Sequence, residues 1–291
     1  MNVRRLLSCC LLFGLSVATT AAVDVRPLPF FYDLYTFRGQ DGRTDVVASF
    51  AVPAGRLEFE RLQGRTRYRF DVSLILTDTT SQTVIRADDS VFVEMRSRPD
   101  ADHLLYTHID VDARPSSSTV HRVIMSDATA PGIGQLYGEA FHIRDYAGDE
   151  LMLSDIALGH PARLGGWRRG DLEIALLPTS QFPGSDFDVY YEIYNLPRRH
   201  AYRTEITVQS LDSRGNEMGE AASVRFRGES TAAPGAAVQE LRRIETMLPR
   251  GKHRITVTVT DLVNGRTAVR SRQFTVRDDR RGVTMVQALP R

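Results

Sequence analysis

The sequence predicts an all-β protein, and three observations lead to that class. Segments of alternating polar and apolar residues recur at short intervals along nearly the whole chain, and such alternation is typical of half-buried strands. Clusters rich in turn-forming residues, such as TDTTSQ, SDATAPG and LDSRGN, separate these segments. The strands do not alternate with helical segments, which argues against a parallel α/β sheet and favours β-sandwiches.

The first 22 residues have the three-part layout of a secretory signal peptide. Arg4 and Arg5 form a positive region, a mostly apolar run covers residues 6–17, and small residues up to Ala22 precede the expected cut. The apolar run is too short to span a bilayer. We therefore expect an exported protein, periplasmic or secreted, whose mature chain has no membrane span.

Removal of residues 1–22 changes two bulk properties of the chain. Both cysteines, Cys9 and Cys10, are lost, which excludes disulfides, thiolate nucleophiles and cysteine-based zinc sites from the mature protein. The loss of Arg4 and Arg5 takes the formal net charge from +1 to −1. Nothing in this charge balance indicates binding to nucleic acid.

The strands are predicted in chain order from their alternation. In the first half they cover 45–53, 68–78, 90–95, 104–112, 121–127 and 135–143. In the second half they cover 171–178, 188–197, 202–212, 253–261 and 270–276. The spacing of apolar residues in 236–248 does not decide between a helix and a strand.

Two parts of the chain resemble each other closely enough to indicate an internal repeat. DVVASFAVP (45–53) precedes YRFDVSLILTD (68–78), just as DVYYEIYNLP (188–197) precedes YRTEITVQSLD (202–212). Between the halves, GHPARLGGWRRG supplies the proline and glycines of a linker. The sequence therefore predicts two tandem immunoglobulin-like β-sandwich domains, at 23–160 and 171–278, with a linker at 161–170 and a C-terminal tail at 279–291. Because this linker is short and polar, we expect each domain to fold independently.

The same strand and turn patterns resemble a known bacterial family. VYYEIYNLPRRHAYRTEITV (189–208), LPRGKHRITVTVTD (248–261) and DELMLSDIALG (149–159) are similar to the β-rich, immunoglobulin-like portions of bacterial GWxTD domain-containing proteins. The resemblance covers most of the mature chain. The motif that names the family is absent, since Gly166-Trp167 is followed by Arg168-Arg169-Gly170. The resemblance implies the sandwiches without the named domain, and it carries over no catalytic residue.

THIDVD (107–112) is the strongest local candidate for a metal-binding or catalytic site. On a strand, His108, Asp110 and Asp112 share one face, while the apolar residues between them take the other. An imidazole and two carboxylates could ligate a divalent metal. The alternative is a solvated strand face, because half-buried strands alternate in the same way. Convergence of these side chains with other carboxylates in a cleft would favour a glycan- or metal-binding protein or a hydrolase, whereas a flat exposed strand would favour a module that binds a protein partner.

Trp167 is a candidate for ligand binding, because an aromatic ring can stack on a sugar. Tyr190, Tyr191 and Tyr194 could contribute to the same surface. Alternation places Tyr190 and Tyr194 on one face of a strand and Tyr191 on the other. At least part of this aromatic set is therefore expected in a core.

Four aspartates close predicted strands and have two interpretations. Their side chains commonly cap turns by accepting hydrogen bonds from the backbone that follows. A calcium site between domains would use similar residues. The four are Asp78, Asp127, Asp212 and Asp261.

The sequence lacks the common enzyme signatures. It contains no Gly-x-Ser-x-Gly elbow, His-Glu-x-x-His pair, P-loop or dinucleotide-binding glycine pattern. These features favour a non-enzymatic binding or structural module that engages a protein partner and needs no cofactor. Two alternatives stay open: an envelope protein that binds a glycan or a metal, and a hydrolase with dispersed carboxylates.

Overall fold

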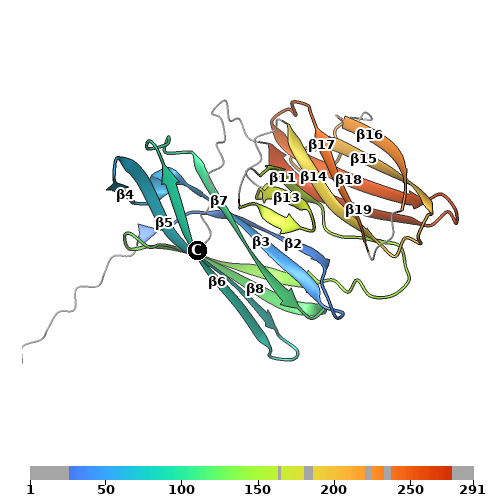
Figure 1. Ribbon diagram of the computed structural model, residues 1–291, viewed down its shortest axis with the longest axis horizontal. Coiled ribbons are helices and arrows are strands. Elements are labelled where there is room, and N and C mark those ends of the chain that lie inside the picture. The colour runs from blue at the N-terminus through green and yellow to red at the C-terminus, as the bar shows by residue number, and fades with distance from the viewer. Residues whose placement is uncertain (1–25, 163–164, 180–185, 220–223, 233–236, 277–291) are drawn as a thin grey trace, which may run out of the picture.

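The computed structural model describes residues 26–162, 165–179, 186–219, 224–232 and 237–276, and these consist almost wholly of strands and turns (Figure 1). Among them the structure has no α-helix, and none of its helical turns is long and apolar enough to cross a membrane. The predicted all-β class is therefore confirmed. The expected signal peptide and C-terminal tail lie outside the described residues.

Two sheets form the first half of the molecule and enclose one apolar cluster. Sheet A has the order β1 (Arg26–Pro27), β9 (Gly132–Ile143), β8 (Ser116–Asp127), β5 (Arg65–Asp78) and β4 (Phe59–Leu62), and β6 (Val84–Met95) also pairs with β5. Sheet B consists of β2 (Phe31–Arg38), β3 (Thr44–Pro53) and β7 (Leu104–Ala113). A short 3-10 turn, η1 (Ala54–Arg56), follows β3.

Two further sheets form the second half around another apolar cluster. Sheet C has the order β10 (Met152–Leu153), β14 (Phe187–Tyr194), β11 (Ala157–Pro161), β13 (Leu172–Leu176) and β12 (Trp167–Arg169), and β17 (Ala237–Ile244) also pairs with β14. Sheet D consists of β16 (Val224–Thr231), β15 (Ala201–Leu211), β18 (Gly251–Asp261) and β19 (Thr267–Val276). Segment 236–248, which the sequence left undecided, is therefore a strand where it is described.

The strand order is the same in both halves, as the internal repeat predicts. The order β6–β5–β8–β9 in sheet A corresponds to β16–β15–β18–β19 in sheet D, and β2–β3–β7 corresponds to β11–β14–β17. The matched sequences thus occupy equivalent strands, β3 with β14 and β5 with β15. Alternation along both strands places one set of side chains in the core, where Phe70 and Val72 of β5 and Ile206 and Val208 of β15 are fully buried.

The segment predicted as a linker, 161–170, instead contributes to sheet C. Both β11 and β12 form hydrogen-bonded pairs with β13. A Cβ atom on Gly166 would lie 2.4 Å from the Cβ of Ala162, so this glycine allows close packing of the backbone. The prediction was wrong because a glycine-rich segment can serve close packing as well as flexibility. The prediction also assigned β10 and most of β11 to the first domain, 23–160, but both strands belong to sheet C.

Sheets B and C also pack on each other, which makes the four sheets successive layers (Figure 1). We call this contact the junction. Its apolar cluster includes Tyr35, Phe37, Val47, Trp167, Ile174 and Tyr190. Because β14 has sheet D on one face and sheet B on the other, all eight of its residues are buried. The two halves therefore share a buried contact. The expectation that they fold independently assumed that only a short polar linker joins them.

Candidate functional site

A cleft of about 580 Å³ opens at one end of the junction, and we call it the junction cleft. Strands of both halves supply its charged side chains, so it exists only where sheets B and C meet. Four carboxylates and two arginines line it. They are Asp45 of β3, Asp110 and Asp112 of β7, Glu192 of β14, Arg38 of β2 and Arg169 of β12.

Strand register brings the three aspartates of the cleft together. Asp45 pairs directly with Asp112 across β3 and β7, and Asp110 lies opposite Val47. Residues two apart on a strand share a face, so all three carboxylates lie on the face of sheet B that is turned toward sheet C. Like charges directly opposite each other destabilise a sheet. The stability of sheet B therefore does not explain this arrangement.

Glu192, in the middle of DVYYEIYNLP, is a buried and fully paired carboxylate. It is 1% exposed, and the hydroxyls of Tyr190 and Tyr194 donate to its two oxygens at 2.6 Å. Arg169 Nε donates to Glu192 Oε1 at 2.7 Å. A buried charge is tolerated when it is paired and hydrogen-bonded in this way. The two tyrosines therefore hold a charge in the junction.

Arg169 connects the two sheets. Its Nη1 donates to Asp45 Oδ2 at 2.9 Å, and its Nη2 donates to the backbone carbonyl of Arg38. Burial nevertheless raises the pKa of Asp45 from 3.8 to about 6. The attraction of Arg169 opposes this rise, and the negative charges of Asp110 and Asp112 add to it. The cleft thus contains a carboxyl that takes up a proton close to neutral pH.

The structure does not bring the three residues of the predicted metal site together. Asp110 and Asp112 are exposed in the junction cleft, whereas His108 is partly buried and does not line it. Burial lowers the pKa of His108. In the part of the chain that the structure describes, no group of three or more such side chains is placed to hold a metal ion. The two aspartates do converge with other carboxylates in a cleft, but the imidazole does not join them.

Trp167 is a core residue of the junction. It is 3% exposed, and its ring stacks on Phe37 with the ring centres 4.7 Å apart. It also meets the ring of Tyr190 edge-on at 5.4 Å. Tyr191 belongs to the cluster between sheets C and D, as its predicted position on the opposite strand face requires. Trp167 therefore presents no ring face on which a sugar could stack.

The strand-closing aspartates cap turns, as one of their two interpretations predicted. The Oδ1 atom of each accepts a hydrogen bond at 2.8 to 2.9 Å from the backbone N–H two residues later. This is the local geometry that stabilises a turn. It holds for Asp78, Asp127, Asp212 and Asp261.

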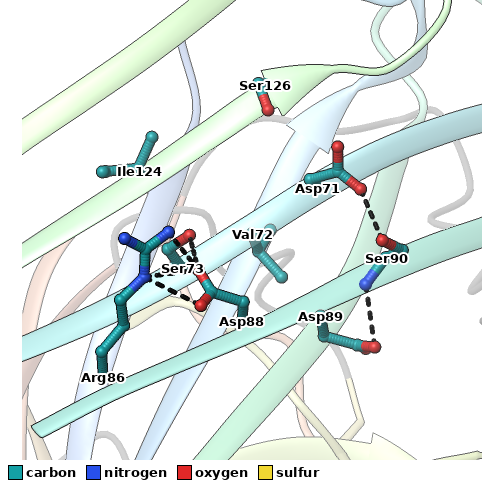
Figure 2. A pocket seen from close by; sticks show the side chains of 9 residues that line it. All are labelled: Asp71, Val72, Ser73, Arg86, Asp88, Asp89, Ser90, Ile124 and Ser126. Carbon is teal, nitrogen blue, oxygen red and sulfur yellow. Dashed lines mark hydrogen bonds and ion pairs between the residues drawn. The ribbon is translucent and has the colours of Figure 1, made fainter.

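A second acidic hollow, of about 510 Å³, lies on the outer face of sheet A, as Figure 2 shows. We call it the outer-face hollow. Of its three carboxylates, Asp71 and Asp88 are paired with side chains of β5 and β6, and Asp89 accepts a hydrogen bond from the backbone N–H of Ser90. Arg86 Nε lies 2.8 Å from Asp88 Oδ2, Ser73 donates to Asp88, and Ser90 Oγ donates to Asp71 Oδ1 at 2.7 Å (Figure 2). These contacts join neighbouring residues of one open sheet face.

Sequence reasoning did not identify Asp45, Arg169 or Glu192 as parts of a site. Arg169 was assigned to the predicted linker, and Glu192 was taken as one residue of an aromatic strand. A charged residue at the centre of a strand made mostly of apolar and aromatic residues was the available signal. Such a residue needs a partner if the strand is buried on both faces.

Comparisons with known proteins do not assign a family. No family model matches the chain, and no curated protein matches it. Among solved structures, a red sea bream transglutaminase has 12% identity and a TM-score of 0.25, and the match covers 85% of this chain and 31% of that one. A Bacteroides uniformis β-glucuronidase has 7% identity and a TM-score of 0.30, with 80% and 26% covered. An Escherichia coli α2-macroglobulin has 10% identity and a TM-score of 0.26, with 87% and 22% covered.

The chain thus spans less than a third of the length of each of these solved structures. TM-scores of 0.25 to 0.30 are too low to support an inference about activity.

Proposed function

We propose that this chain is an exported, non-enzymatic binding module whose two immunoglobulin-like sandwiches present the junction cleft to a basic segment of a protein partner. Two kinds of observation support this. The layout of the first 22 residues is that of a secretory signal. The repeated strand order, with β6–β5–β8–β9 facing β2–β3–β7 in one half and β16–β15–β18–β19 facing β11–β14–β17 in the other, supports the immunoglobulin-like part of the proposal. Folds of this class commonly bind partners through surfaces that a rigid scaffold holds in place.

The observation that carries the proposal is the surplus of carboxylates in the junction cleft. Both arginines are already engaged, Arg169 by buried carboxylates and Arg38 by a backbone carbonyl and the side chain of Asn195. Asp110 and Asp112 are exposed, and neither forms an ion pair within the described residues. A partner's arginine or lysine would supply the missing positive charge.

The cleft suits a basic side chain better than it suits a sugar. Sugar binding commonly uses an open aromatic face, and the aromatic side chain that lines this cleft is Tyr194. The guanidinium of Arg38 covers its ring at 4.4 Å, and Tyr146 packs against it with the ring centres 4.9 Å apart. Carboxylates are then the groups that remain for a ligand, and they favour a cationic group.

The test uses fluorescein-labelled hexa-arginine and hexaglutamate as probes in fluorescence anisotropy at low ionic strength. We expect the mature protein to bind hexa-arginine and not hexaglutamate. The double variant Asp110→Asn/Asp112→Asn should lower the affinity for hexa-arginine by about tenfold. The matched control is Asp71→Asn/Asp88→Asn, which removes the same charge from the outer-face hollow and should change the affinity by less than about twofold. Equal weakening in both variants would show that the probe responds to overall charge, and would reject the cleft.

A hydrolase is the second candidate, and the raised pKa of Asp45 favours it. Glycoside hydrolases pair a carboxyl that stays protonated near neutral pH with a second carboxylate. Asp45 has a pKa of about 6 and lies beside the exposed Asp110 and Asp112. A panel of nitrophenyl glycosides at pH 5 to 7 separates the two candidates. If the wild type hydrolyses a glycoside and Asp45→Asn abolishes that activity, the protein is a hydrolase and the binding proposal is rejected.

A further inference from the structure

Charged and titratable groups surround Asp45 from every strand packed around it. Its own carboxylate is 15% exposed, and that of Glu192 is 2% exposed. A single guanidinium is therefore shared between two carboxylates of low exposure, while two more carboxylates lie nearby. The surrounding groups are Arg169 of β12, Glu192 and Tyr194 of β14, Asp110 and Asp112 of β7, and Arg38 of β2.

The burial of Asp45 depends on the junction. Asp45 lies on the face of sheet B that is covered by sheet C, and its partner Arg169 belongs to sheet C. If the two sheets separated, the carboxylate would regain water and move away from Glu192. The protonation of Asp45 and the packing of the two halves are therefore coupled.

We propose that the junction is a proton-responsive latch, in which a proton taken up by Asp45 tightens the packing of sheet B on sheet C and its release loosens that packing. The latch is a property of the folded chain alone, so it does not depend on the binding function proposed above. It would make the junction, and the cleft at its end, respond to the pH of the surrounding solution.

The direction of the effect follows from the pKa of Asp45. Burial raises this pKa from 3.8 to about 6, against the pull of Arg169 and with the help of the neighbouring aspartates. An acid with a raised pKa binds its proton more tightly in the packed state than in the open state. Packing is therefore strongest below the ordinary pKa of 3.8, weakens as the pH rises from there to about 6, and changes little above that value. Between pH 5.0 and 7.5 the equilibrium constant for opening should rise about tenfold.

Trp167 offers a direct readout of the junction. It is the chain's single tryptophan and is 3% exposed at the contact between sheets B and C. Quenching of its fluorescence by acrylamide along a urea titration reports opening of the junction, and far-UV circular dichroism reports the strands. The comparison is made at pH 5.0 and 7.5 for the mature wild type, Asp45→Asn and Asp88→Asn. Asp88→Asn is the matched control, because it makes the same substitution on the outer face of sheet A.

We expect the opening constant to rise about tenfold between pH 5.0 and 7.5 in the wild type and in Asp88→Asn, and by less than about twofold in Asp45→Asn. If Asp45→Asn does not fold, Asp112→Asn replaces it. This exposed substitution removes a charge that raises the pKa of Asp45, so its response should be smaller than that of the wild type. A wild type without a pH response, or a variant that keeps the full response, would overturn the latch.

Discussion

The junction cleft and the outer-face hollow are similar in size and both rich in carboxylates, but their ion pairs differ in origin. In the outer-face hollow, Asp88 is paired with Arg86, two residues away on the same strand, and both side chains are more than half exposed. Such a pair forms on one sheet whether or not the rest of the molecule is packed. Exposed ion pairs of this kind contribute between 0 and about 1 kcal/mol to stability.

In the junction cleft, the ion pairs join residues that are far apart in the sequence. Arg169 and Asp45 are separated by 124 positions, and their side chains are 21% and 15% exposed. The cleft therefore exists only when both halves of the chain have folded and packed together. The comparison teaches that volume and acidity alone do not distinguish a site from an ordinary sheet surface. Burial and long-range pairing do.

The largest effect that can test this comparison comes from Arg169→Met. The substitution keeps much of the side-chain volume but leaves Glu192 and Asp45 without their cation. Removing one partner of a buried ion pair typically costs about 3–5 kcal/mol. We expect a loss of that order in urea unfolding at pH 7.5. Arg86→Met is the control and should cost far less, because solvent screens its exposed ion pair. Similar losses in the two variants would remove the distinction between the two regions.

A smaller effect is expected from Tyr194→Phe. This change removes one of the two hydroxyl donors to Glu192, a hydrogen bond of 2.6 Å, and keeps the ring that packs in the junction. Hydrogen bonds to charged groups contribute about 1.5–3 kcal/mol. We expect a loss in that range by urea unfolding. Ser90→Ala, which removes a 2.7 Å hydrogen bond to the partly exposed Asp71, provides the comparison on the outer face and should cost less. A Tyr194→Phe variant as stable as the wild type would show that Glu192 does not need this donor.

The predictions that succeeded depend on local patterns. Alternation in YRFDVSLILTD placed Phe70 and Val72 in the core, because a period of two requires it once one face is buried. The aspartate caps, such as Asp78, followed from hydrogen bonds that reach only two residues along the chain. Each of these features is set by neighbours in the sequence, so the sequence alone was sufficient to predict it.

The junction could not be predicted in this way, because it depends on contacts between distant segments. The alternation of Tyr190, Glu192 and Tyr194 showed that they share a strand face, but not that a second sheet covers it. The glycines near Trp167 read as a flexible connection, although Gly166 serves the close approach of strands. The glutamate between two tyrosines was visible in the sequence, but its partner Arg169 lies 23 positions away on another strand.

The smallest effect should come from Asp88→Asn in the outer-face hollow. The carboxylate of Asp88 is 51% exposed, and hydrogen bonds from Arg86 and Ser73 lower its pKa. An acid with a lowered pKa stabilises the fold above its ordinary pKa and loses that contribution as the pH falls through the lowered value. Solvent screens this pair, so the loss at pH 7.5 should stay within about 0.5 kcal/mol. Urea unfolding at pH 7.5 and 3.5 measures it, and the difference between variant and wild type should shrink at the lower pH. A loss above about 2 kcal/mol at pH 7.5 would mean that carboxylates on an open sheet face matter as much as those buried in the junction.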